Sequence, residues 1–186
     1  SENCTAIVIA CNTASAHAFK TVKNVAGPDI PVFNVIDPLV AFIAARYQNQ
    51  KVGIIATRGT IKTRVYPRRI KIANDSITVA SKATPLLAPM IEEGFFNNNI
   101  SKTVIESYLK ARELNGISAL VLGCTHYPLI QSEVEAFFKG SVDIIDSANV
   151  VAESVARGYS LKGKEVTDKF YVSDFTKGFE KSTQTF

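Results

Sequence analysis

The chain has 186 residues, of which 46% are apolar and 20% are charged, and this balance is typical of a globular protein rather than a disordered or collagen-like one. No apolar run reaches the roughly 20 residues that a membrane span needs. The 21 basic residues are interspersed with 17 acidic ones, for a formal net charge of +4, so no nucleic-acid-binding surface is expected.

Short apolar runs alternate with helical patterns along the chain. We expect strands at residues 5–10, 30–35, 52–56, 77–81, 118–123, 142–145 and 170–173. Helices are expected at 14–25, 37–48, from about 60 onward, 85–93, 101–115, 128–138 and 148–159, with a short helical tail after the last strand. Asp37 and Pro38 are typical of an N-cap followed by the first helical position. Pro67 should kink or shorten the helix in which it falls.

The sequence contains an internal repeat, with one copy near the start of the chain and the other in its second half. AIVIACNT (6–13) and ALVLGCTH (119–126) each have an alanine, three branched aliphatic residues, a small residue, a cysteine and then polar residues. Continuous apolar strands separated by helices predict parallel sheets with helices on both faces. Ligands bind beyond the carboxyl ends of such strands. The sequence therefore predicts an α/β fold of two similar parallel-sheet domains, with the active site in the cleft between them.

Cys11 and Cys124 each stand between a strand end and a helix start. The positive end of a helix favours the thiolate form of a nearby cysteine, and its free N–H groups can hold a carboxylate. Two such cysteines suggest that the protein acts chemically on a small carboxylic acid, with one cysteine on each side of it. The alternative is that the cysteines are buried and inert, as cysteine often is.

The other cysteine chemistries fit less well. Cys4 has no comparable context and is expected to be structural, and His17 is expected to be a surface or packing residue. Three cysteines in all indicate a reducing compartment, and a cytoplasmic protein is expected, because the start of the chain lacks the basic segment of a signal peptide. Cys11, Cys124 and His126 do not have the spacing of a zinc site, so we expect no metal, and nothing calls for a cofactor.

These motifs resemble those of the glutamate racemases, in the aspartate/glutamate racemase superfamily. ACNTASA (10–16) and LGCTHYPL (122–129) are similar to the two catalytic motifs of that family, and VGIIATRGTIKTRVY (52–66) and ATPLLAPMIEEG (83–94) are similar to the segments between them. NVIDP (34–38) resembles its interdomain hinge. With this hinge, the expected domains are residues 1–33 plus 144–186, N-terminally incomplete, and residues 34–143.

The resemblance implies a cofactor-independent isomerase that interconverts L- and D-glutamate and supplies D-glutamate for peptidoglycan, and hence for cell-wall biogenesis and cell shape. Cys11 and Cys124 are then the paired acid and base. His126 and Glu92 assist them, with Glu93 as a weaker candidate than Glu92. The expected substrate-binding residues are Asn12, Thr13, Thr125 and His126, and a homodimer is expected.

The resemblance fails at the beginning of the chain. The family opens with a strand that ends in Asp-Ser-Gly-x-Gly-Gly, and this sequence has no such motif. We expect that roughly the first 60 residues of a typical member are missing in front of Ser1. Two alternatives remain open: a racemase for aspartate or another small amino acid, and a truncated, inactive carboxylate-binding domain.

Overall fold

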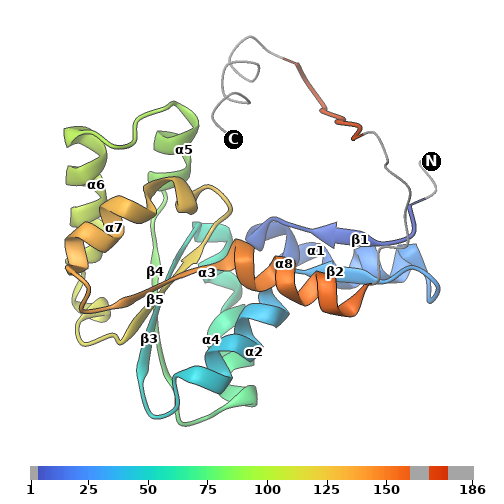
Figure 1. Ribbon diagram of the computed structural model, residues 1–186, viewed down its shortest axis with the longest axis horizontal. Helices are drawn as coiled ribbons and strands as arrows, with labels where there is room; N and C mark the ends of the chain where they lie inside the picture. The colour runs from blue at the N-terminus through green and yellow to red at the C-terminus, as the bar shows by residue number, and fades with distance from the viewer. Residues whose placement is uncertain (1–3, 160–167, 176–186) are drawn as a thin grey trace.

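The computed structural model describes residues 4–159 and 168–175. In this part of the chain it contains two parallel sheets, one of four strands and one of two, which lie side by side in an elongated molecule (Figure 1). The α/β fold with two parallel-sheet units that the sequence predicts is confirmed. In the described residues no helix is both long enough and apolar enough to cross a membrane.

The larger sheet has the strand order β4-β3-β5-β6, with every pair parallel. Its strands are β3 (Lys51–Ala56), β4 (Thr78–Ala83), β5 (Ala119–Gly123) and β6 (Asp143–Asp146). The two central strands, β3 and β5, are almost entirely buried. This is why their sequences are continuous apolar runs without the alternation of a half-exposed strand.

Helices cover both faces of the larger sheet. On one face, α2 (Ile36–Arg46) and α4 (Val65–Ala73) pack over Val52 and Ile54. On the other face, Ile55 and Leu120 are covered by three helices, α5 (Leu87–Glu92), α6 (Asn99–Leu109) and α7 (Gln131–Phe138). Two short 3₁₀ helices, η1 (Arg112–Leu114) and η2 (Tyr127–Ile130), complete the second layer. Successive strand residues point to opposite faces, so Ile54 and Ile55 enter different cores.

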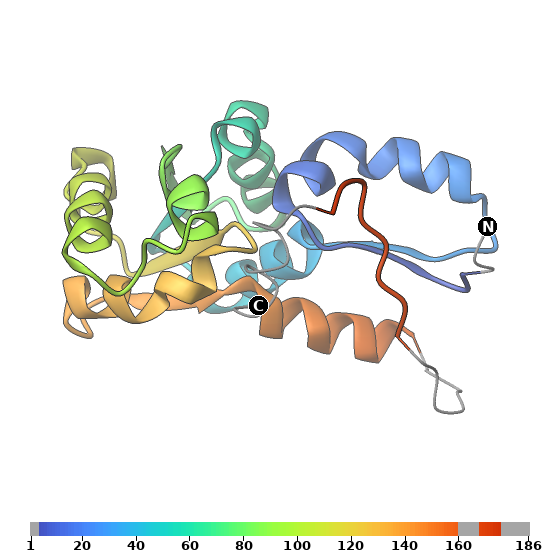
Figure 2. The same ribbon diagram turned by 90° about the horizontal axis from the view of Figure 1, so that it is seen from above.

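The smaller sheet pairs β1 (Ile7–Ile9) with β2 (Val32–Asn34) in parallel. α1 (Asn12–Ala26) lies over one face of these strands and α8 (Ser147–Gly158) lies along the other (Figure 2). Val8 of β1 is exposed, and within the described residues β1 pairs with β2 alone. The remaining helix, α3 (Arg58–Thr63), follows β3 and packs against α1, so it joins the two units.

Several expected boundaries are wrong. The helix after β3 breaks at Arg64, in a left-handed conformation at φ 52°, and not at Pro67, which stands in the first turn of α4, where no helical N–H bond is lost. α2 begins at Ile36, before Asp37, because the Asn34 side chain accepts hydrogen bonds from the backbone N–H groups of Ile36 and Asp37 (both 2.9 Å).

The expected strand at 170–173 is absent, since these described residues form no strand; the expected helical tail lies outside the described residues. The expected domain limits, residues 1–33 with 144–186 and residues 34–143, remain a prediction. The limit between residues 143 and 144 falls inside β6, which pairs with β5 in the larger sheet.

Candidate active site

The first cysteine motif lies where β1 turns into α1. Cys11 is the N-cap residue of α1 and is exposed, and the helix continues directly into Asn12 and Thr13. The Ser15 hydroxyl donates to the carbonyl of Ile9 (2.9 Å) and accepts from the N–H of Val35 (3.3 Å). This serine ties the first turn of α1 to the ends of both strands of the smaller sheet, and so fixes where Cys11 stands.

The second cysteine motif follows β5 in the larger sheet. Cys124 is buried, and its carbonyl accepts the N–H of Tyr127 (3.1 Å), which closes a tight turn. The Tyr127 hydroxyl shares a hydrogen bond with that of Thr84 (2.7 Å) beyond the end of β4. Thr84 thus anchors the turn that carries Cys124.

A line of three groups leads from Cys124 to the surface. The Cys124 sulfur lies 3.7 Å from Nδ1 of His126, and Nε2 of His126 lies 3.1 Å from Oε1 of Glu92, the last residue of α5. Both residues expected to assist the cysteines are thus brought to one of them. Glu92, and not Glu93, makes the contact with the histidine.

The environment of Cys124 favours the neutral thiol. Burial raises the pKa of Cys124, and the charges of Cys11 and Glu92 raise it further. Hydrogen bonds from the His126 backbone and the Thr125 side chain act in the opposite direction but do not cancel the effect. In the described geometry the Cys124 thiol therefore keeps its proton near neutral pH.

The two cysteine motifs approach each other. Cys11 is near enough for its charge to affect the pKa of Cys124. Ala10, just before Cys11, and the exposed Thr125, just after Cys124, line one cavity of about 490 Å³ with residues of α8. Its walls are largely apolar, and include Val8 and Val151. The predicted site residues thus come from both units.

Asn12 and Thr13 make their side-chain contacts with the larger unit. The Tyr66 hydroxyl of α4 donates to Oδ1 of Asn12. The hydroxyl of Thr13 lies 2.8 Å from that of Thr57 and 3.0 Å from that of Thr60, at the start of α3. Our sequence reasoning did not select Thr57, Thr60 or Tyr66. The signal was available, because Thr57 directly follows β3, at the same sheet edge as Cys124.

The packing of α1 on α3 is close. Gly59 allows it, since a Cβ at this position would lie 3.0 Å from Cγ2 of Thr13. Nε2 of His17 lies 3.3 Å from the carbonyl of Gly59. The expectation that His17 is a surface or packing residue agrees with this exposed contact.

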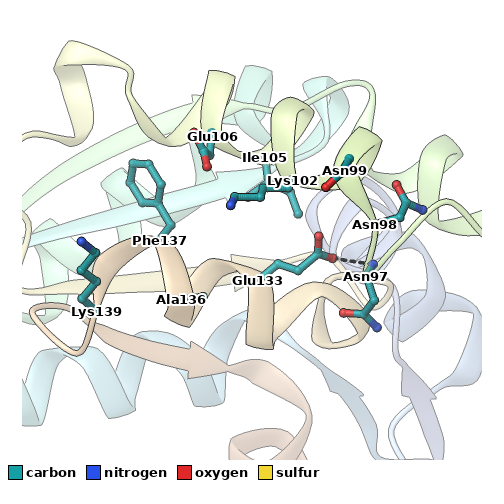
Figure 3. A pocket seen from close by; sticks show the side chains of 10 residues that line it. All are labelled: Asn97, Asn98, Asn99, Lys102, Ile105, Glu106, Glu133, Ala136, Phe137 and Lys139. Carbon is teal, nitrogen blue, oxygen red and sulfur yellow. Dashed lines mark hydrogen bonds between the residues drawn. The ribbon is translucent and has the colours of Figure 1, made fainter.

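A second cavity, of about 650 Å³, lies between α6 and α7 and contains none of the predicted site residues (Figure 3). Glu133 on its wall accepts hydrogen bonds from the N–H of Asn97 (2.9 Å) and the hydroxyl of Ser101 (2.6 Å). Its carboxylate is thus engaged in holding the start of α6, which explains its position without a ligand.

We expect alkylation to distinguish the two cysteines. Iodoacetamide reacts with thiolates, and each unit by which a pKa is raised lowers the thiolate fraction about tenfold below that pKa. Near neutral pH the buried Cys124, with its raised pKa and restricted access, should therefore react more slowly than the exposed Cys11. Peptide mapping by mass spectrometry at several pH values measures both rates, with Cys4 as an exposed reference. Equal rates would contradict the described environment of Cys124.

Comparison with known proteins identifies the class to which this fold and site belong. The family model described as "Asp/Glu/Hydantoin racemase" matches residues 1–155, and the chain belongs to this family. Its relatives in the family include glutamate racemases. It is 39% identical over 166 residues to the glutamate racemase of Aquifex pyrophilus, covering 89% of this chain and 63% of that protein. It is 34% identical over 180 residues to that of Sulfurihydrogenibium sp. (strain YO3AOP1), covering 96% of this chain and 68% of that protein.

A solved structure agrees with these relatives. The glutamate racemase of Francisella tularensis subsp. tularensis SCHU S4, in complex with D-glutamate, matches with a TM-score of 0.84 and 34% identity, over 97% of this chain and 68% of that one. The chain thus spans about two thirds of the length of these relatives, and slightly less for the Aquifex protein.

Proposed function

We propose that the protein is a cofactor-independent glutamate racemase, an isomerase that interconverts L- and D-glutamate. The observation that carries this proposal is the approach of two strand-end cysteines from two sheets, one of them buried and backed by the His126–Glu92 pair. Similarity to glutamate racemases, including one solved with D-glutamate, supports the choice of substrate.

In the proposed reaction, the two thiols act on opposite faces of one α-carbon. With Cys11 as thiolate and Cys124 as thiol, Cys11 takes the α-proton and the C–H electron pair stays on the α-carbon, delocalised into the carboxylate. Cys124 then gives its proton to the other face, which leaves Cys11 protonated and Cys124 as thiolate. The opposite substrate enantiomer restores the starting state. A single base would return the proton to the face it left.

The remaining groups of the site support this step. Nδ1 of His126, 3.7 Å from the Cys124 sulfur, would stabilise the thiolate formed there, and Glu92, in contact with Nε2, would orient the imidazole. We propose Asn12, Thr13, Thr125 and His126 as substrate contacts, since their N–H and O–H groups can hold the substrate carboxylates. Preorganised donors of this kind lower the barrier by stabilising charge as it develops.

The wider role follows from the same proposal. D-glutamate made here would serve peptidoglycan, in the cytoplasm where its precursors are assembled, and the protein would act as a homodimer. These assignments rest on the family resemblance.

Chiral chromatography of reaction mixtures tests the proposal. The full-length protein, given L-glutamate without added cofactor, is expected to produce D-glutamate until both enantiomers are equal. Parallel reactions with aspartate, alanine and glutamine define the substrate. Turnover of aspartate alone would identify an aspartate racemase. Glutamate binding in calorimetry, without exchange of the α-proton for solvent deuterium, would identify a binding domain and overturn the proposal.

A further inference from the structure

Asn12 stands beside Cys11 in a buried position, and only one end of its amide is satisfied. The residue is 2% exposed. Its Oδ1 accepts a hydrogen bond from Tyr66, whereas its Nδ2 has no hydrogen-bond partner among the described residues. Buried amide groups without partners are rare, because losing contact with water is costly unless a new hydrogen bond replaces it.

Tyr66 reaches Asn12 from the other unit. It lies in the first turn of α4, is 1% exposed, and packs in the core between α4 and the larger sheet. Burial raises the pKa of Tyr66 far above the ordinary range of tyrosine, so the hydroxyl keeps its proton near neutral pH and can donate it in a hydrogen bond. A hydroxyl can also accept a hydrogen bond, but the bond to Oδ1 of Asn12 is the one that uses the Tyr66 proton in the described part of the chain, so the amide orientation with its carbonyl end toward Tyr66 is favoured.

We propose that Tyr66 is a positioning residue that sets the orientation of the Asn12 amide, so that Nδ2 is presented as a hydrogen-bond donor to a carboxylate oxygen of the substrate. An amide can rotate by half a turn with little change of shape, which exchanges its donor and acceptor ends. With the acceptor end outward, the amide would repel a carboxylate. The hydroxyl of Tyr66 favours the other orientation, in which its proton has an acceptor, and we expect the unpaired Nδ2 to gain its partner when substrate binds.

This inference rests on the proposed function, because it needs a carboxylate substrate next to Cys11. The inference goes beyond the proposed function in two respects. It gives a function to Tyr66, which lies in α4 behind the site. It also predicts that a residue of the larger unit controls the substrate contact made by Asn12 of the smaller unit.

The test is a double-mutant cycle in the full-length protein. Tyr66→Phe removes the hydroxyl and keeps the ring, and we expect kcat/KM for glutamate to fall about five- to tenfold, the usual effect of one neutral hydrogen bond. Asn12→Ala should reduce it at least as much. Adding Tyr66→Phe to Asn12→Ala should then change nothing further, since the hydroxyl acts through the amide.

Tyr47→Phe is the matched control. Tyr47 is also a buried tyrosine whose hydroxyl donates to a side chain, Oδ2 of Asp143 at 3.2 Å, but at the end of α2 and away from the site. Its substitution should leave kcat/KM within twofold. Asn12→Asp provides a second variant, because aspartate still accepts from Tyr66 but has no N–H to offer; D-glutamate affinity in calorimetry should fall at least tenfold.

The outcomes separate the two proposals. If the wild type neither binds nor racemises glutamate, the proposed function fails, and this inference falls with it. If the wild type is active but Tyr66→Phe matches it, the positioning role alone is overturned. The same holds if Tyr66→Phe lowers activity equally in the wild-type and Asn12→Ala backgrounds, since the effect would then be general packing.

Discussion

Racemisation of glutamate should fall by roughly a thousandfold or more when either Cys11 or Cys124 is replaced by serine, because positioned acid–base groups contribute about 10²–10⁴-fold each. A serine hydroxyl is a much weaker acid than a thiol and cannot take and return the proton near neutral pH. The rate of L-to-D conversion measures the loss. Deuterium incorporation at the α-carbon, followed from each enantiomer separately, identifies the face at which each cysteine acts.

Cys4→Ser is the control for this experiment. Cys4 is exposed and precedes β1, outside both cysteine motifs. Its substitution should leave the rate unchanged, which excludes a general effect of losing a thiol. Wild-type rates in Cys11→Ser and Cys124→Ser would rule out the two-base mechanism.

We expect Gly123→Ala to be the most damaging single-methyl change at the site. Gly123 ends β5 directly before Cys124, and a Cβ there would lie 2.8 Å from the backbone carbonyl oxygen of Ile55. Backbone in the centre of a sheet cannot move aside, so β5 and β3 must separate locally. Overpacking of this kind costs about 1–3 kcal/mol of stability, and a displacement of about 1 Å at Cys124 can lower the rate a hundredfold.

Gly158→Ala offers a comparison, because its Cβ would meet only the movable ring of Phe33, at 3.1 Å, at the end of α8. The two variants should differ clearly in thermal unfolding and in turnover. The melting temperature should be lowered by several degrees for Gly123→Ala alone. Equal melting temperatures would mean that β5 tolerates a side chain at this position.

The fold could be predicted from sequence wherever one physical signal dominated. The buried strands β3 and β5 are continuous runs of branched residues, and no competing pattern overlaps them. The segment at 170–173 contains aromatic and β-branched residues, but strand propensity alone does not form a strand without a neighbouring strand to pair with. The helix break at Arg64 could not be predicted from the sequence, because a residue other than glycine in the left-handed conformation is not marked by its residue type.

The site was predictable to the extent that the chemistry lies in the motifs themselves. His126 stands two residues from Cys124, so local sequence could suggest their contact. Tyr66 and Asn12 are far apart in the chain, and their contact arises only when α1 packs on α3 and α4. Supporting residues of this kind depend on tertiary packing, which a reading of strand and helix patterns does not supply.

The hydroxyl groups of Thr13, Thr57 and Thr60 also have a mechanical consequence. They lie within 3.2 Å of one another, and the Asn12–Tyr66 contact is beside them. A rotation of one unit against the other would leave these contacts intact if its axis passed through them. The start of α1 would then be the pivot of the rotation, and the far end of α8 would undergo the largest displacement. Cys11, close to the axis, would keep its distance to Cys124 nearly constant while the opposite side of the site opened for substrate exchange.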